Sequence, residues 1–117
     1  FSANSISVSS IQIDNTQLGS VSLTTNSTIA TQIFAFSAIS YSSMEILIQA
    51  KTIDDINTTK ILLCVSQTDV KTTEYGSLWM TEKLFTTHAV REGDSVKVIV
   101  TPLFSTEMRF NASYSIM

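Results

Sequence analysis

The sequence predicts an all-β domain, an antiparallel β-sandwich of jelly-roll-like arrangement with about seven or eight strands and an extended N-terminal arm. Apolar residues alternate with polar ones at a period of two residues along most of the chain. Turn-forming residues interrupt this alternation about every 8–12 residues. No stretch carries an apolar stripe at the helical period of about 3.6 residues. With 117 residues, the chain has the length of one ordinary domain.

Residues 1–27 differ in composition from the rest of the chain. They contain no aromatic residue after Phe1 and no charged residue other than Asp14, and they are rich in Ser, Thr, Asn and Gln. Such a segment is too poor in large apolar groups to build a core by itself. We predict an extended arm or the end of a fibrous shaft over residues 1–27, able to pair with a neighbouring subunit by strand addition, and a sandwich domain over residues 28–117. An ordinary edge hairpin of the same sandwich is the alternative.

Three predicted strands follow the arm. "TQIFAFSAI" (31–39) places two phenylalanines on one face, and "SMEILIQAKTI" (43–53) alternates from Met44 to Ala50. "TKILLCVSQ" (59–67) is apolar on both faces, which predicts a central strand covered on both sides. Its Cys64, the only cysteine, is then expected to be a buried and unreactive thiol, and no disulfide can form within the chain.

The C-terminal third predicts a hairpin and a final strand. "REGD" (91–94) is a turn signal, and "SVKVIVTPLF" (95–104) alternates valines with polar residues up to Pro102 at the strand end. "EMRFNASYSIM" (107–117) alternates without interruption. We expect the core to be formed by Phe34, Phe36, Ile46, Ile48, Leu63, Val98, Val100, Phe110 and Tyr114.

The stretch "VKTTEYGSLWM" (70–80) holds the only tryptophan of the chain. A strand bent or bulged at Gly76 is expected, because a missing Cβ allows the backbone to deform there. Tyr75 and Trp79 are candidates for a glycan-binding platform, because sugar rings stack on aromatic side chains. The acceptors for the sugar hydroxyls would be Glu74 and Glu82. In the alternative, Trp79 packs into the core or a subunit interface, as lone tryptophans usually do.

Several function classes are disfavoured. The net charge of −3 and the singly scattered basic residues offer no patch for nucleic acid or an anionic membrane, and no apolar run reaches the ~20 residues of a membrane span. The only histidine, His88, has no Cys or His cluster around it. Asp54, Asp55 and Asn57 have poor spacing for a cation loop. We therefore expect no metal, no cofactor and no enzymatic activity.

The order of the segments resembles a known family. The first segment is "STIATQIFAFSAISYSSMEILIQAKT" (27–52). It is followed by "TKILLCVSQTDVKTTEYGSLWM" (59–80), in which Thr73-Glu74-Tyr75-Gly76 is the most recognisable motif, and by "KLFTTHAVREGDSVKVIVTP" (83–102). Over residues 28–117 this order is similar to a β-sandwich module of virion structural proteins of tailed phages from marine and cyanobacterial hosts. The chain departs from the family pattern at residues 66–69, where a glycine-bearing turn is usual, and at Leu78-Trp79.

The resemblance implies a non-enzymatic building block of a virion, made in the host cytoplasm and carried in the extracellular particle. Its expected place is a tail fibre, a neck appendage or another tail-associated part, and its expected partners are copies of itself, with a trimer favoured, and other virion proteins. A head decoration protein and a receptor-recognition module that binds a host surface glycan are the alternatives. Because the chain begins at Phe1, we expect a processed form or a piece of a longer protein.

Overall fold

The computed structural model describes residues 10–117, which form nine β-strands and no helix. No segment of this part of the chain is therefore a helix able to cross a membrane. The strands are β1 (Ser10–Ile13), β2 (Thr16–Thr25), β3 (Thr31–Ser37), β4 (Ser43–Lys51), β5 (Ile56–Val65), β6 (Val70–Trp79), β7 (Phe85–Glu92), β8 (Ser95–Pro102) and β9 (Met108–Ile116).

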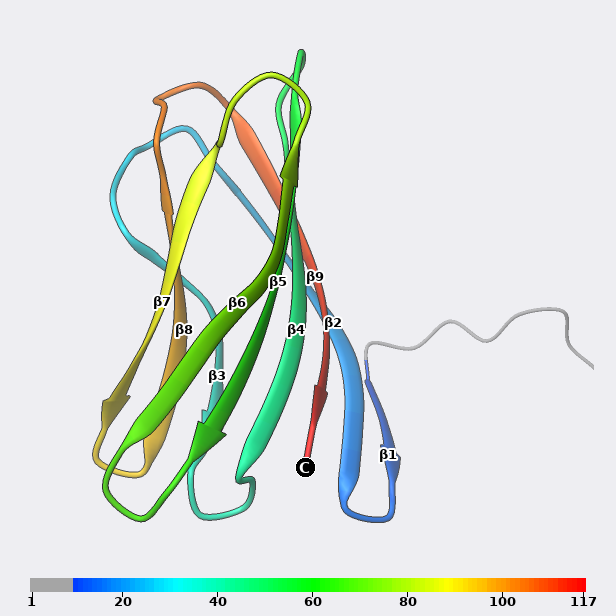
Figure 1. The fold of residues 1–117 in the computed structure, drawn as a ribbon, viewed down its shortest axis with the longest axis vertical. Helices are drawn as coiled ribbons and strands as arrows, with labels where there is room; N and C mark the ends of the chain where they lie inside the picture. Colours follow the sequence, from blue (N-terminus) through cyan, green and yellow to red (C-terminus); the bar gives the residue numbers. More distant parts are fainter. Residues whose placement is uncertain (1–9) are drawn as a thin grey trace, which may run out of the picture.

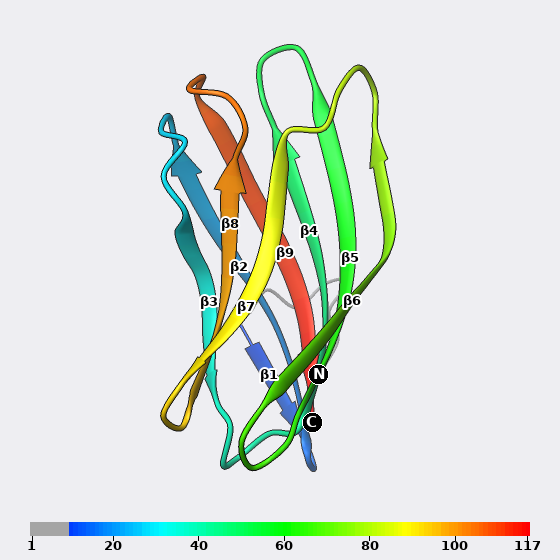
Figure 2. The same ribbon diagram turned by 60° about the vertical axis from the view of Figure 1, so that its left-hand side comes forward.

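The strands form two antiparallel sheets packed face to face (Figures 1 and 2). The larger sheet has six strands in the order β1-β2-β9-β4-β5-β6, and the smaller has three in the order β3-β8-β7. The prediction of an all-β antiparallel sandwich is confirmed. The inner face of the larger sheet contacts the smaller sheet, and we call its other face the outer face.

The core lies between the sheets and follows the predicted alternation. On β4 and β9 every second residue is buried, from Met44 to Ala50 and from Met108 to Ile116, while the residues between them point outward. Eight of the nine residues predicted for the core are buried, and the ninth, Phe34, is half-buried with its ring centroid 4.2 Å from that of Tyr114.

The prediction for β5 is wrong in one respect. Ile61 and Leu63 are buried between the sheets, but Leu62 and Cys64 point to the outer face and are exposed. The strand is central in its sheet and has β4 and β6 as neighbours, yet no second layer covers its outer face. Apolar residues at successive positions therefore do not mark a strand covered on both sides here, and the Cys64 thiol is not buried.

The hairpin β1–β2 lies at one edge of the larger sheet. β2 pairs with β9 over nine residues, from Gln17 to Thr25, and its Val21 and Leu23 pack against the core. Of the two alternatives for the N-terminal segment, residues 10–25 therefore adopt the edge hairpin, while residues 1–9 lie outside the described part of the chain. The domain boundary at residue 27 stays a prediction.

Gly19 of β2 faces Tyr114 of β9 directly. A Cβ built on Gly19 would overlap the tyrosine ring, so only glycine leaves room for the ring at this position. The buried Tyr114 ring thus lies over Gly19, with the Phe34 ring on it at an interplanar angle of 33°.

The loops gather at the two ends of the sandwich. The end at the top of Figure 1, which we call the apical end, carries loops 26–30, 52–55, 80–84 and 103–107. The opposite, basal end carries the turns at 14–15, 38–42, 66–69 and 93–94. The last of these is the predicted hairpin turn, with Gly93 at φ +59°.

Candidate functional site

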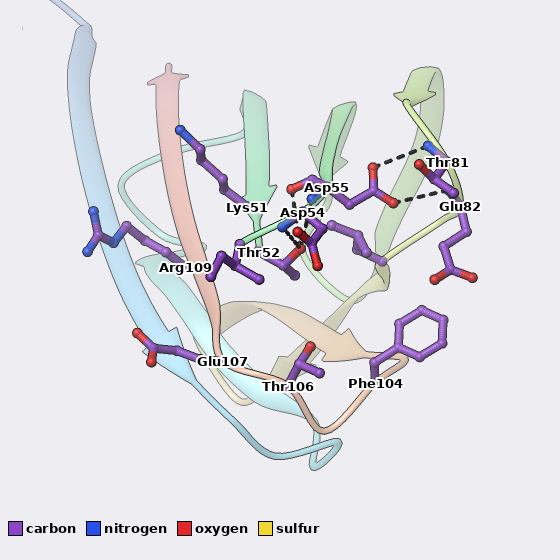
Figure 3. A pocket seen from close by; sticks show the side chains of 12 residues that line it. Lys51, Thr52, Asp54, Asp55, Thr81, Glu82, Phe104, Thr106, Glu107 and Arg109 are labelled. Carbon is purple, nitrogen blue, oxygen red and sulfur yellow. Dashed lines mark hydrogen bonds between the residues drawn. The ribbon is translucent and has the colours of Figure 1, made fainter.

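A pocket of about 710 Å³ lies at the apical end. It lies between loops 52–55, 80–84 and 103–107 and the adjoining ends of β4 and β9 (Figure 3). Three separate connections of the chain therefore build one pocket, which the antiparallel order of the strands brings to the same end.

The carboxylate of Asp55 fixes two of these loops to each other. Its Oδ1 accepts hydrogen bonds from the amides of Ile56 (2.9 Å) and Thr81 (3.2 Å), and its Oδ2 accepts one from the amide of Glu82 (3.2 Å; Figure 3). On the other side of the loop, Thr52 Oγ1 accepts hydrogen bonds from the amides of Asp54 and Asp55. The wall formed by loops 52–55 and 80–84 is thus held by short side-chain-to-backbone bonds.

Asn57 secures the same connection from the core side. Its side chain is fully buried, Nδ2 donates to the carbonyl of Leu78 (3.1 Å), and Oδ1 accepts from the amide of Leu84 (2.9 Å). The side-chain oxygens of Asp55 and the side-chain amide of Asn57 are thus already hydrogen-bonded to backbone groups. In residues 10–117, no group of three or more His, Cys, Asp or Glu side chains is placed to hold a metal ion.

The remaining polar groups of the pocket point toward solvent. Lys51, the last residue of β4, lies directly opposite Arg109 of β9, and both are exposed on the outer face. Phe104 lies on the opposite rim with 36% of its surface exposed (Figure 3). The carboxylates of Asp54, Glu82 and Glu107 are exposed around the same pocket. The pocket therefore offers cations, acceptors and one aromatic ring to a ligand.

A second group of interacting side chains lies on the outer face, around Tyr75. The pairing of β5 with β6 shifts between Lys60 and Ile61, and Tyr75 is the extra residue next to Gly76 at this bulge. Lys60 Nζ lies 3.0 Å from Glu45 Oε1 and 5.5 Å from the centroid of the Tyr75 ring. The bulge expected at Gly76 is confirmed, and it directs the tyrosine onto a surface ion pair.

The charges in this group influence each other. The hydrogen bond from Lys60, and after it the one from Tyr75, holds the pKa of Glu45 below its ordinary value of 4.5. The Glu45 carboxylate in turn is the main cause that raises the pKa of Lys60 above 10.5. The side chains of Lys60 and Glu45 are 40% and 49% exposed, so the ion pair is charged over the whole neutral range but is screened by water.

The four residues predicted to form a glycan or interface contact lie in different places. Tyr75 faces outward with Lys60, whereas Glu74 lines a cavity of about 120 Å³ between the sheets, next to His88 of β7. Trp79, with 46% of its surface exposed, lies opposite the inward-facing Asn57 in the β5–β6 pairing. Glu82 lines the apical pocket. Tyr75 and Trp79 therefore lie on opposite faces of β6, and the four residues do not form one platform.

Sequence reasoning did not find Lys51, Phe104 or Arg109. The cation pair exists only because β4 and β9, which are more than fifty residues apart in the sequence, are neighbours in register. Phe104 could have been suspected as an aromatic residue in a loop directly after a strand that ends in Pro102.

The fold and the pocket together define an antiparallel β-sandwich domain with an open ligand-sized cavity at one end. No family model matches the chain, and the search of curated proteins gives no match. Among solved structures, the chain is similar to the tailspike protein of Acinetobacter baumannii phage AM24, with a TM-score of 0.46 and 11% sequence identity. The similarity covers 87% of this chain and 26% of that one, so this chain spans about a quarter of the length of the tailspike protein.

Proposed function

We propose that this chain is a non-enzymatic structural module of a tailed-phage virion, located in a fibre, neck appendage or other tail-associated part. It assembles with copies of itself, as a trimer, through the outer face of the larger sheet. The observation that carries the self-assembly is a group of exposed apolar side chains on that face.

These side chains, which we call the outer-face strip, are Ile11, Ile13, Leu18, Leu47 and Leu62. Ile11 lies directly opposite Leu18 across the β1–β2 ladder, and they are 43% and 39% exposed. Along the same row of the sheet, Leu18 is followed by Ser115, Glu45 and Leu62 on β9, β4 and β5. Single exposed apolar residues are ordinary, but several on one face mark a surface that another protein covers.

The charges on this face also favour burial by a partner. Within the strip the charged side chains are Glu45 and Lys60, and they neutralise each other at 3.0 Å. A second copy can therefore cover the strip without leaving an isolated charge, which would cost several kcal/mol. Lys51 and Arg109 lie on the same face beyond the strip, at the apical ends of β4 and β9. The serines of β2 and β9 that separate the apolar residues are small and uncharged, and they allow close approach.

The virion placement is supported by the resemblance of residues 28–117 to the phage structural module. The apical end remains open when copies meet through the outer face, because the loops of that end lie beyond the ends of the strands. A fibre built in this way would have its apical loops directed along the fibre axis.

Light scattering of the purified chain during size-exclusion chromatography tests the assembly. A mass three times that of the 12.8 kDa chain is expected. The double variant Ile11→Ser/Leu18→Ser should elute as a monomer and keep a cooperative thermal transition. Ile39→Ser, which changes an exposed apolar residue at the basal end outside the strip, is the control and should remain a trimer. A native monomer at 100 µM, or a trimer unaffected by the double change, would contradict the proposed interface.

Gold-labelled antibodies against this chain, applied to purified particles and viewed by electron microscopy, test the location. Label on the tail or neck is the expected result. Label spread over the head would instead place the chain among head decoration proteins, and particles without label would refute the virion assignment.

A further inference from the structure

The apical pocket contains a charge arrangement that is unfavourable for the protein alone. Lys51 and Arg109 lie directly opposite each other on adjacent antiparallel strands. The ion pairs within residues 10–117 are Lys60–Glu45, Lys71–Asp69 and Lys97–Glu92, so neither cation at the pocket has a carboxylate within 4.0 Å. Like charges at directly opposed positions of a sheet destabilise it. An anionic group bound between them would remove this repulsion.

The rest of the pocket does not resemble a simple anion site. Asp54 and Thr52 lie between the cation pair and the opposite rim, where Phe104 presents part of its ring (Figure 3). Carboxylates repel free inorganic anions but accept hydrogen bonds from neutral hydroxyl groups. An aromatic ring contributes an apolar surface against which the C–H face of a sugar can pack.

A ligand that contacts both the cation pair and the side of the pocket with Asp54 and Phe104 needs an anionic group at one end. It also needs several hydroxyl groups on a ring with an apolar face. We propose that the apical pocket binds an acidic saccharide, a sugar ring with a carboxylate. The carboxylate lies between Lys51 and Arg109, the hydroxyls donate to Asp54, and the apolar face packs on Phe104. A volume of about 710 Å³ accommodates such a ligand of one to three rings.

The part of the wall that Asp55 and Asn57 hold is fixed before any ligand enters, because their side chains are bonded to the backbone of loop 80–84 and its flanks. Binding therefore does not have to order the backbone of this wall, which favours affinity, and the ordering is confined to the exposed side chains that contact the ligand. The inference goes beyond the proposed assembly and does not depend on it, since the pocket is contained in a single copy of the chain.

Titration of the ¹⁵N-labelled full chain with a galacturonate trisaccharide tests the proposal. The expected result is binding, with amide shifts concentrated in residues 52–55, 81–84 and 104–107. The methyl ester of the same trisaccharide, which has lost the charges, should bind at least about tenfold more weakly. Inorganic sulfate should bind more weakly than the trisaccharide, because it makes no use of Asp54 and Phe104.

Matched variants locate the binding site. Lys51→Gln and Arg109→Gln should each weaken trisaccharide binding about tenfold or more, whereas Lys71→Gln, the same charge change at the basal end, should leave it unaltered. Phe104→Ala should also weaken binding, and Leu103→Ala, its exposed neighbour, should not. All five side chains are exposed, so no variant should melt below the native chain. Lys51→Gln and Arg109→Gln should melt slightly higher, because each removes the repulsion between the two cations.

Three results would overturn the proposal. The first is no binding of the trisaccharide at 10 mM. The second is equal affinity for the charged and esterified forms, which would leave the cation pair without a role. The third is sulfate binding as tight as that of the trisaccharide, which would reduce the site to a general anion contact. The assembly proposed above would stand in each case, because its test uses different residues and a different measurement.

Discussion

The buried amide of Asn57 and the backbone of Leu84 hold the chain where it passes from the larger to the smaller sheet. Oδ1 of Asn57 accepts the hydrogen bond of the Leu84 amide at 2.9 Å, while Nδ2 donates to the carbonyl of Leu78. The fully buried side chain thus spans the connection between β6 and β7. Asn57 and Asp55 together therefore position loop 80–84, which forms one wall of the apical pocket.

Replacement of Asn57 by alanine should therefore destabilise the fold. The change removes two hydrogen bonds and leaves the Leu84 amide without its partner in a buried place, so the free energy of unfolding should fall by about 2–3 kcal/mol. Urea unfolding followed by circular dichroism measures it. Thr58→Ala, on the outward-facing neighbour, is the control and should change the value by less than about 0.5 kcal/mol. Equal effects of the two variants would show that the amide bonds contribute nothing to the connection.

Gly19 is required by the Tyr114 ring. A Cβ at position 19 would overlap that ring, so Gly19→Ala should displace Tyr114 and lower stability by about 1–3 kcal/mol. Gly76 is the matched control, because a Cβ there would approach only Lys60 Cβ at 4.0 Å. Thermal unfolding of both alanine variants distinguishes the two positions. Were Gly76→Ala the more damaging of the pair, the tight contact of β2 with Tyr114 would not be the reason for the glycine.

Removal of residues 1–27 tests the predicted domain boundary. This segment contains β2, whose Val21 and Leu23 pack against the core and whose backbone pairs with β9. The shortened chain, residues 28–117, should therefore lose its cooperative thermal transition or melt at a clearly lower temperature. Leu23→Ala in the full chain should lower stability by about 1–3 kcal/mol, since the leucine is partly buried. A shortened chain as stable as the full one would instead support an arm that is separate from the sandwich.

Glu45 should titrate below its ordinary pKa of 4.5, mainly because of the hydrogen bond from Lys60. A lowered pKa in the folded state means that the carboxylate contributes stability above about pH 4.5 and that this contribution is lost as the pH falls below that value. The carboxyl carbon of Glu45, followed by NMR between pH 2 and 7, reports the midpoint. In Lys60→Gln the midpoint should move up toward 4.5. An unchanged midpoint in this variant would mean that another group lowers the pKa.

The alternating pattern alone determined much of this fold. Which side chains of β4, β8 and β9 face the core could be predicted because a period of two residues is a local property of an extended chain. The bulge at Gly76 and the turn at Gly93 were also predictable, since glycine marks places where the backbone departs from an ordinary strand. Absence of a helical stripe excluded a helical fold.

Only the tertiary structure decided which faces are covered and which distant residues meet. The exposure of Leu62 and Cys64 depends on the smaller sheet covering only one side of β5, and no local pattern contains that information. Lys51 meets Arg109 because β4 and β9, which are remote in sequence, pair in one register. Tyr75 meets Glu45 through Lys60 because the bulge in β6 directs the tyrosine to the outer face. The sequence therefore determined the faces of the strands, and long-range pairing, which sets the order of strands in the sheets, decided the surfaces on which a ligand or a partner can bind.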